Sequence, residues 1–460
     1  MYLLYNSTRS SSHGGGPLNL IATPVHILDG WGLSSKIFLV IVGIGLGIFT
    51  FTLFDFKLNA VFNYAFALAP IWLPFVTFLL FFENWLWYVR KEYNIAKGRV
   101  TLEIKLPQEI LKSPQAMELA LIQLHQTASP DNHVQTYVDG KHPPKYGLEI
   151  VSRGGDVRFY INAQRAKTKN IVETQLYAQY PGIEVHELDI DYTAEFPWDP
   201  NRFSYFSLHF GLMEPDAYPI KTYIDYELDR MPDEDEKVDP ITSVIEMLGN
   251  IGPDENIWVQ ILIDAHREVK FKHGSLTYQP DWKEEARAEI KKIIDGAVKR
   301  AGAEESKGNV MQLLTETEKD TVKAIERSIG KIAFNTNIRT MYIAKKELYN
   351  PVERIGAIIT MWRAYEDQNR NRIGFQWRTD YDWNWWQDPH GHHATAYKRQ
   401  ELNEYKRRYY TSHSTKDVSK VMTIEELATI FHFPGKVAST PSLARIPSKR
   451  SEPPPNLPIG

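Results

Sequence analysis

The residues best suited to metal chemistry lie in one short loop. Residues 388–393 read DPHGHH, so His390, His392 and His393 follow an aspartate closely. Imidazole and carboxylate groups are ligands that suit zinc or a similar ion. The loop lacks the i, i+4 spacing with which a helix presents two histidines to one metal. A solvated loop with adventitious histidines is therefore the simpler interpretation, and a metal site is the alternative.

The sequence contains no nucleotide-binding motif. A P-loop requires G-x-x-x-x-G-K-[ST], in which backbone amides and a lysine surround the phosphates. The nearest strings, at residues 328–331 and 433–436, lack the first glycine and the hydroxyl residue after the lysine. Cysteine is absent, which excludes thiol catalysis, disulfides and Cys-ligated zinc or iron–sulfur clusters. We therefore expect no enzyme activity and no catalytic, cofactor-binding or metal-binding residues.

Two further groups could contact nucleic acid, but both have simpler explanations. Aromatic residues crowd residues 377–386, yet Asp380, Asp382 and Asp388 lie among them and would repel phosphate. Five basic residues within residues 398–408 are typical of an exposed helix face. With 53 Lys+Arg against 57 Asp+Glu, the net charge of −4 excludes a general polyanion binder. We expect nucleic acid to be contacted only indirectly.

Two uncharged apolar runs, residues 37–54 and 61–82, dominate the N-terminal part. The first is 18 residues long, about 27 Å as a helix, which approaches the hydrocarbon thickness of a bilayer. The second contains Pro70 and Pro74, which spanning helices tolerate. The runs predict a two-helix transmembrane hairpin, and a pair of buried core helices is the alternative.

Basic residues predict the orientation of this hairpin. Arg90 and Lys91 follow the second run, and Arg9 and Lys36 precede the first. Because basic residues favour the cytoplasmic side, we expect a multi-pass protein of the inner (cytoplasmic) membrane with both termini cytoplasmic.

The following residues predict an α+β fold made of two ferredoxin-like (split βαβ) modules. Residues 100–190 read as strand, helix, strand, strand, helix, strand, with a hairpin turn at residues 153–156. Strands at residues 203–212, 218–228, 256–264 and 336–344, with helices at 240–248 and 351–365, predict a second module. A helix over 319–329 belongs to the same module, and a long amphipathic helix over residues 282–307 interrupts it as a helical insertion.

The expected organisation follows from these patterns. It comprises a flexible tail (1–36), the membrane anchor (37–92), the first module (93–200), the second module (201–370), an aromatic loop with a helical C-terminal part (371–434), and a proline-rich basic linker (435–460). Thr423 and Glu426 form a capping box that predicts a short helix ending near Phe431.

Three segments carry a resemblance to a known family. Residues 218–223 read YPIKTY, residues 338–347 read IRTMYIAKKE, and residues 423–460 run from TIEELATIFHFP to PPPNLPIG. In these segments the chain resembles the membrane-attached N-terminal accessory region of bacterial conjugative coupling-type ATPases of the TraD/TraG and HerA-like group. Members of that group continue into a nucleotide-binding motor, which this sequence lacks. The resemblance implies that the motor is a separate polypeptide, or that the tail reaches one.

The expected function is a non-catalytic, membrane-anchored accessory component of a conjugation or type IV secretion-like transport machine. Its expected partners are the lipid bilayer and a P-loop motor ATPase, with a second copy of the chain as a further candidate. The alternatives are a membrane-bound metal-dependent hydrolase using the His390–His393 loop, and a membrane scaffold unrelated to transport.

Overall fold

The computed structural model describes most of the chain after the first apolar run. The described residues are 58–107, 112–126, 133–165, 168–229, 238–267, 281–300, 312–379, 388, 390–413, 417–435 and 445–446. The chain forms two compact units, Met1–Trp85 with Asp382–His392, and Leu86–Tyr381 with His393–Gly460. All of the described strands belong to the second unit.

The N-terminal part differs from the expectation. Helix α3 (Leu58–Lys97) contains the second apolar run and continues without a break past Arg90 and Lys91, whereas residues 37–54 lie outside the described residues. No helix in the described part of the chain combines the length and apolar character needed to cross a membrane. The predicted transmembrane hairpin at residues 37–92 is therefore wrong, as is the multi-pass inner-membrane location with both termini cytoplasmic.

Ten strands form one mostly antiparallel sheet within the described residues. Their order is β10-β1-β3-β2-β6-β7-β5-β8, and β4 also pairs with β1 while β9 also pairs with β7. The strands are β1 (Arg99–Pro107), β2 (Lys145–Arg153), β3 (Asp156–Gln164), β4 (Glu184–Glu187), β5 (Phe203–Leu212), β6 (Glu255–Ala265), β7 (Ala333–Lys345), β8 (Ile373–Arg378), β9 (Lys420–Thr423) and β10 (Arg445–Ile446).

The predicted fold class, two ferredoxin-like modules behind a transmembrane hairpin, is wrong because the strands form a single sheet. Strands β2 and β6 pair from Lys145↔Asp264 to Arg153↔Asn256 and join the two halves. Each of these strands is hydrogen-bonded on both sides, β2 to β3 and β6, and β6 to β2 and β7, so neither is the edge that a separate module would have. Within the sheet, the halves repeat one strand order, β4-β1-β3-β2 and β8-β5-β7-β6.

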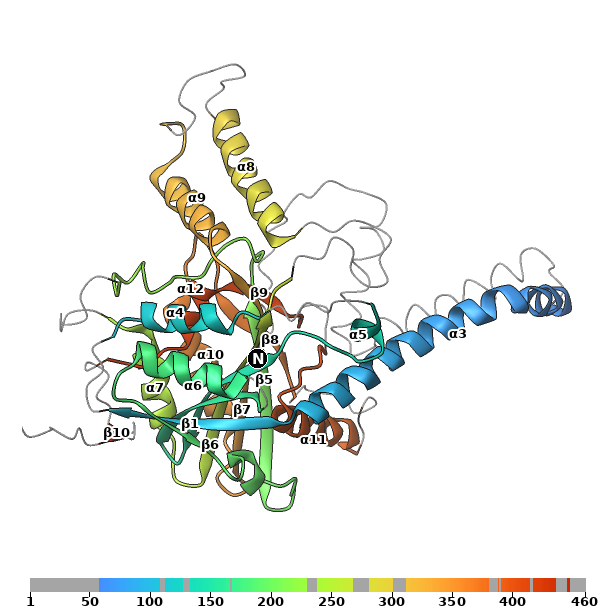
Figure 1. Ribbon diagram of the computed structural model, residues 1–460, viewed down its shortest axis with the longest axis horizontal. Coiled ribbons are helices and arrows are strands. Elements are labelled where there is room, and N and C mark those ends of the chain that lie inside the picture. Colours follow the sequence, from blue (N-terminus) through green and yellow to red (C-terminus); the bar gives the residue numbers. More distant parts are fainter. Residues whose placement is uncertain are drawn as a thin grey trace, which may run out of the picture. The chain divides into compact units, whose positions relative to one another are not determined.

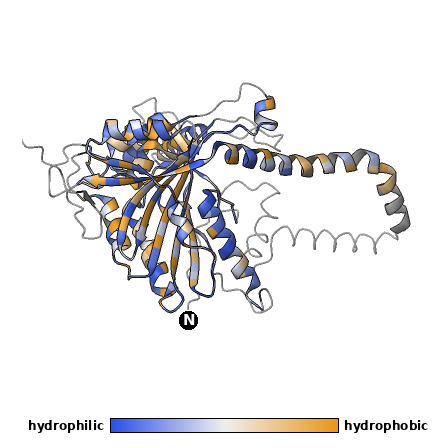
Figure 2. Cartoon of the chain, turned by 60° about the horizontal axis from the view of Figure 1, so that its bottom comes forward, coloured by the Kyte–Doolittle hydropathy of each residue, from blue (hydrophilic) through white to orange (hydrophobic). Residues whose placement is uncertain are grey.

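Helices cover both faces of the sheet (Figure 1). One face packs on α4 (Gln115–Leu124), α6 (Thr168–Gln179), α7 (Pro240–Gly249), α10 (Pro351–Thr360), the 3₁₀ helix η3 (Met361–Tyr365) and α12 (Ile424–Ile430). The opposite face packs on α11 (His392–Arg407) over a smaller, aromatic cluster that includes Tyr160, Trp258 and Tyr405. Figure 2 shows hydrophobic and hydrophilic residues alternating along the strands, because successive side chains point to opposite faces of the sheet and the two faces differ in polarity. The short helices α5 (His133–Tyr137) and η1 (Tyr192–Glu195) lie in connections.

Several predicted elements are confirmed and two are not. Asp239 caps α7 by accepting a hydrogen bond from the Ile241 amide, and the capping box of Thr423 begins α12. The strand expected at residues 218–228 is instead a series of turns, because the Asp225 carboxylate accepts the Thr222 amide and folds the backbone locally. Strand β8 lies where an irregular segment was expected.

The helical insertion between β6 and β7 is a pair of helices. Helix α8 (Trp282–Arg300) lies beside α9 (Glu316–Ile329), and Figure 1 shows the two side by side. Ala286 packs with Ile325 between them, and Arg300 pairs with Glu318 at 2.7 Å. The predicted amphipathic helix over residues 282–307 is thus confirmed as far as Arg300, where the described part of α8 ends.

The β2–β3 turn provides a test of the packing between the turn and α7. Gly154 and Gly155 have φ values of +57° and +91°, and a Cβ on Gly155 would lie 2.8 Å from the Gly249 carbonyl oxygen. Gly155→Ala should lower the free energy of unfolding by more than about 2 kcal/mol, measured by urea denaturation. Gly154→Ala, with its nearest atom at 3.5 Å, is the matched control and should cost about 1 kcal/mol. Equal losses would contradict the close approach.

Candidate functional site: the junction around helix α12

Helix α12 is short and entirely buried. All seven of its residues are buried, and β9 leads directly into it, pairing with β7 up to Ala333↔Thr423. The Glu426 carboxylate accepts the Thr423 amide at 2.8 Å, and the Thr423 hydroxyl accepts the Glu426 amide at 3.4 Å. Because an isolated helix of this length is unstable, the cap and the surrounding contacts must hold it in place.

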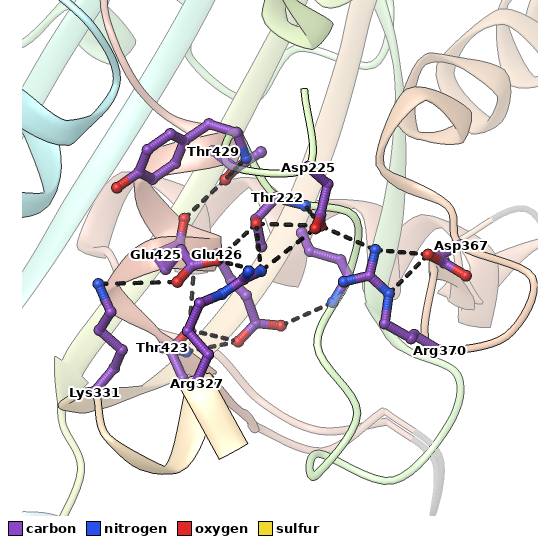
Figure 3. Close-up of polar contacts among 12 residues, drawn as sticks. Thr222, Asp225, Arg327, Lys331, Asp367, Arg370, Thr423, Glu425, Glu426 and Thr429 are labelled. Carbon is purple, nitrogen blue, oxygen red and sulfur yellow. Dashed lines mark hydrogen bonds and ion pairs between the residues drawn. The ribbon is translucent and has the colours of Figure 1, made fainter. Parts of the chain in front are cut away.

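The segment at residues 218–223 crosses α12 and is bonded to it at three points (Figure 3). The Ile220 amide donates to Glu426 at 3.2 Å, and the Thr222 hydroxyl donates to Glu425 at 2.6 Å. The Tyr223 amide donates to the Thr429 hydroxyl at 3.0 Å. Two of the segments that carried the family resemblance, some two hundred positions apart, therefore meet here.

Two basic side chains attach the end of α9 to this junction. The Arg327 guanidinium lies 3.0 Å from the Glu425 carboxylate (Figure 3). The Lys331 ammonium lies 2.5 Å from Glu118 of α4 and 3.9 Å from the second oxygen of Glu425. Glu118 and Glu425 are both buried, so these cations neutralise carboxylates that would otherwise be costly to bury.

A second pair of ions supports the loop beside α12. Asp225 accepts from Arg370 at 2.9 Å, and Arg370 also pairs with Asp367. Burial opposes ionisation of Asp225, but the Thr222 amide and the guanidinium groups of Arg370 and Arg327 outweigh it and lower the pKa. The loop thus contributes a fixed negative charge beside Arg327.

Glu426 differs from the other acids of the junction. Burial raises its pKa to about 7, and the neighbouring Glu425 charge acts in the same direction. Hydrogen bonds from Thr423 and Ile220 lower the pKa but do not compensate. Glu426 therefore takes up a proton near neutrality, whereas its neighbour is paired with cations.

The FHFP motif at residues 431–434 anchors the chain in the core. Phe431 and Phe433 contact Phe159 with ring centroids 5.8 and 5.5 Å apart, and Phe433 also contacts Tyr180. The His432 ring lies 3.1 Å from the Asp239 carboxylate that caps α7. The motif that carried the resemblance is therefore held by packing and by one capped helix.

The next described residues after Gly435 form β10. Arg445 and Ile446 pair in parallel with Leu106 and Pro107 at the end of β1. Two points of the C-terminal segment are therefore fixed to the second unit: residues 431–434 in the core and β10 at the sheet.

The residues singled out in the sequence have different positions. His390, His392 and His393 are exposed. Asp380, Asp382 and the aromatics at 381–386 lie outside the described residues. Trp377 is buried in β8 and stacks on His413.

The C-terminal end of the basic helix is not the exposed face that the simpler explanation predicted, because Arg408 is buried and Lys406 is bonded within the fold. Arg408 is buried and binds Glu149 at 2.9 Å and Asp191 at 2.8 Å. The Lys406 ammonium donates to the Phe196 carbonyl. Nothing in the sequence distinguishes Arg408 from its exposed neighbour Arg407.

A different group converges in a manner that could hold a metal ion. Within the described residues, Glu401, Glu404 and His413 bring ligand atoms within 4.8 Å of one another. These atoms are already hydrogen-bond partners: His413 lies 2.7 Å from Glu401, and Glu404 accepts from Thr411. The Arg339 guanidinium, 3.8 Å from Glu401, would repel a cation. We assign no metal to this group.

Sequence reasoning found only part of the junction. The capping box located Glu426, but Glu425 and Glu118 were missed because each reads as an ordinary helix-surface acid. The one available signal was that Glu425 lies in a helix whose other residues are largely apolar. Its partner Arg327 lies on a helix nearly a hundred residues away.

The pairing of Arg327 with Glu425 can be measured. A double-mutant cycle of Arg327→Met and Glu425→Gln should give a coupling energy of about 1–3 kcal/mol in urea denaturation, because Glu425 is buried. The exposed pair Arg372–Glu366, 3.3 Å apart, is the control and should give less than about 0.5 kcal/mol. A coupling no larger than the control would mean that the junction is not held by this pair.

The raised pKa of Glu426 predicts a pH-dependent difference in stability between the Glu426→Gln variant and the unmodified protein. The folded pKa of about 7 lies above the ordinary 4.5, so the folded state binds the extra proton and stability falls as pH rises from about 4.5 to 7. Glu426→Gln keeps a capping side chain without the charge. Relative to the unmodified protein, this variant should gain about 1–2 kcal/mol of stability between pH 5 and pH 8. A difference that does not change with pH would contradict the raised pKa.

Comparison with known families gives one match. Residues 121–445 match the family described as a domain of unknown function, DUF8128, and no curated protein matches the sequence. The description assigns no function, so the match does not test the predicted role in a type IV secretion-like machine. The match includes every strand from β2 to β9. Because it covers well over half of the chain, the protein belongs to the DUF8128 family.

Proposed function

We propose that this protein is a non-catalytic accessory component that couples to a P-loop motor ATPase through its C-terminal segment. In this proposal the α12 junction is the base from which the segment leaves the fold. The motor is a separate polypeptide or a separate domain.

The observation that carries the proposal is the contact between the two resembling segments. Residues 218–223 and 423–434 resemble the accessory region of coupling-type ATPases, and they meet through backbone and side-chain hydrogen bonds at α12. Contacts of this kind specify a geometry, because a buried amide without its acceptor is costly. The two segments that carry the resemblance are therefore one structural unit in this fold.

The path of the C-terminal segment supports the same function. Phe431 and Phe433 fix its beginning in the core, and β10 fixes Arg445 and Ile446 beside β1. The residues that follow are rich in proline and include Lys449 and Arg450. Proline limits the conformational entropy lost on binding, and the basic residues suit an acidic partner surface.

The charges of the junction suit a rigid joint better than proton transfer to a substrate. Glu118 and Glu425 face Lys331 and Arg327, and the hydroxyl groups of Tyr223 and Thr222 donate to Glu118 and Glu425 respectively. Within the described residues, the second oxygen of Glu425 has no hydrogen bond and faces only Lys331, 3.9 Å away. This pairing stabilises one arrangement of α4, α9 and α12. It gives the segment a fixed point of departure.

The proposal is tested with two deletions. We expect the intact, tagged chain to retain a P-loop ATPase encoded beside its gene in a pull-down. Deleting residues 448–460 leaves β10 intact and should reduce retention at least about ten-fold with an unchanged unfolding midpoint. Deleting residues 436–460 removes β10 as well and should reduce retention at least as much.

A charge control separates docking from general electrostatics. Lys449→Glu with Arg450→Glu should weaken retention, whereas Lys291→Glu with Lys292→Glu on the exposed face of α8 makes the same charge change elsewhere and should not. Retention unchanged by the 448–460 deletion would overturn the proposal.

A further inference from the structure

A continuous row of mostly polar side chains crosses the face of the sheet that α11 covers. Residues directly opposite one another on neighbouring strands share a face, and the register places seven of them in line. In order across the sheet they are Glu103, Tyr160, Glu149, Gln260, Arg339, His209 and Trp377. Glu149, Gln260, Arg339 and His209 are fully buried at the centre. A helix that packs on this row must therefore carry polar groups that hydrogen-bond to these side chains.

Helix α11 and the residue after it supply this cover. Glu401 and Tyr405 lie one turn apart on α11, and Arg408 follows three residues later. Arg408 binds Glu149 through two nitrogen atoms at 2.9 and 3.1 Å, and the Tyr405 carbonyl accepts from Gln260 at 3.2 Å. Glu401 reaches the other end of the buried centre, at His209.

The His209 ring is held between two carboxylates. Its Nε2 lies 2.8 Å from Glu401, and its Nδ1 lies 3.0 Å from Asp417 in the segment after α11. Carboxylate oxygens only accept hydrogen bonds, so both ring nitrogens carry protons and the ring is a cation. The Tyr410 hydroxyl donates to Asp417, and the His413 ring donates to Glu401.

Protonated His209 supplies one of the two cations that face Glu401 and Asp417. The other is Arg339 of β7, 3.8 Å from Glu401, while the Trp377 ring of β8 packs on His209 without adding charge. Glu404 adds a third carboxylate within 4.8 Å of Glu401. Loss of the His209 proton therefore leaves these carboxylates with a single cation, and it removes one hydrogen bond from either Glu401 or Asp417.

We propose that His209, Glu401 and Asp417 form a pH-responsive latch that holds α11 on the sheet and releases it when His209 loses its proton. The latch is independent of the coupling to a motor. It acts on the face of the sheet opposite α12.

The electrostatics of the group agree with this geometry. Burial lowers the pKa of His209, but Glu401 and Asp417 outweigh it and raise the pKa to about 8. Burial opposes ionisation of both acids, yet the His209 cation and its hydrogen bonds hold their pKa values below the ordinary range. The folded pKa of His209 exceeds the ordinary 6.5, so its contribution is complete below pH 6.5 and is lost as pH rises through 8.

The chain contains no cysteine, so one engineered thiol can report on the latch. Leu402 of α11 is fully buried against the sheet, and its neighbour Asn403 is exposed. We would measure thiol labelling of Leu402→Cys relative to Asn403→Cys, which cancels the pH dependence of the thiol itself. The ratio should rise roughly ten-fold between pH 6.5 and pH 9.

Controls separate the latch from general unfolding. Leu176→Cys lies buried in α6 on the other face, and its labelling relative to the exposed Thr174→Cys should not change over the same range. His209→Gln should abolish the pH-dependent rise, with the ratio already high at pH 6.5. Glu401→Gln removes one of the carboxylates that a neutral His209 leaves without its cation, so it should also remove the rise.

Three results would overturn the proposal. They are a constant ratio in the unmodified background, an equal rise at Leu402 and Leu176, and a rise that persists in His209→Gln. Should His209→Gln fail to fold, a rise that persists in Glu401→Gln has the same force.

Discussion

The fold depends on the pairing of charges buried at the centre of the sheet. Arg339, Glu149 and His209 could not remain there unpaired, since each uncompensated buried charge costs several kcal/mol. The Gln260 amide joins their two ends, donating to Glu149 at 2.7 Å and accepting from Arg339 at 2.8 Å. The Gln260–Glu149 bond crosses the seam between β2 and β6, so the row also fixes the two halves in one register. A one-residue slip would move the whole row to the apolar face.

The opposite face of the sheet is buried in a different way. There the sheet is apolar, and helices α4, α6, α7 and α12 bury it without charges at its centre. Polar pairs on this side of the sheet include those where α9 and the turns after residue 218 meet α12, and the pair of His432 with Asp239. Because α12 has too few residues to be stable alone, its position is set by these neighbours. The point at which the C-terminal segment leaves α12 is therefore set by contacts with residues far away in the sequence.

Local features of the fold could be predicted from the sequence, and the pairing of distant elements could not. The caps at Asp239 and Thr423 act within one turn, so their residue types suffice to predict the helices. The β2–β6 pairing was missed because a strand buried on both faces looks the same in a module edge and in a sheet centre. The apolar composition of residues 61–82 suggested a membrane span, although the helix continues through charged residues. In the candidate site, Glu426 was found through its cap, whereas Glu425, Arg408 and His209 are defined by partners that no local pattern reveals.

The two faces respond to different ranges of pH because their raised pKa values have different causes. Glu426 holds a proton because burial disfavours its charge, and it loses that proton near pH 7. His209 holds a proton because two carboxylates favour its charge, and it loses that proton near pH 8. Both effects reduce stability as pH rises, while Asp225 and Asp417, with lowered pKa values, reduce it only as pH falls below about 4. Burial lowers the pKa values of His125 and His142, so these two groups oppose the trend and reduce stability as pH falls below 6.5. Helix α11 should loosen from the sheet near pH 8, which is above the pH near 7 at which Glu426 of α12 loses its proton.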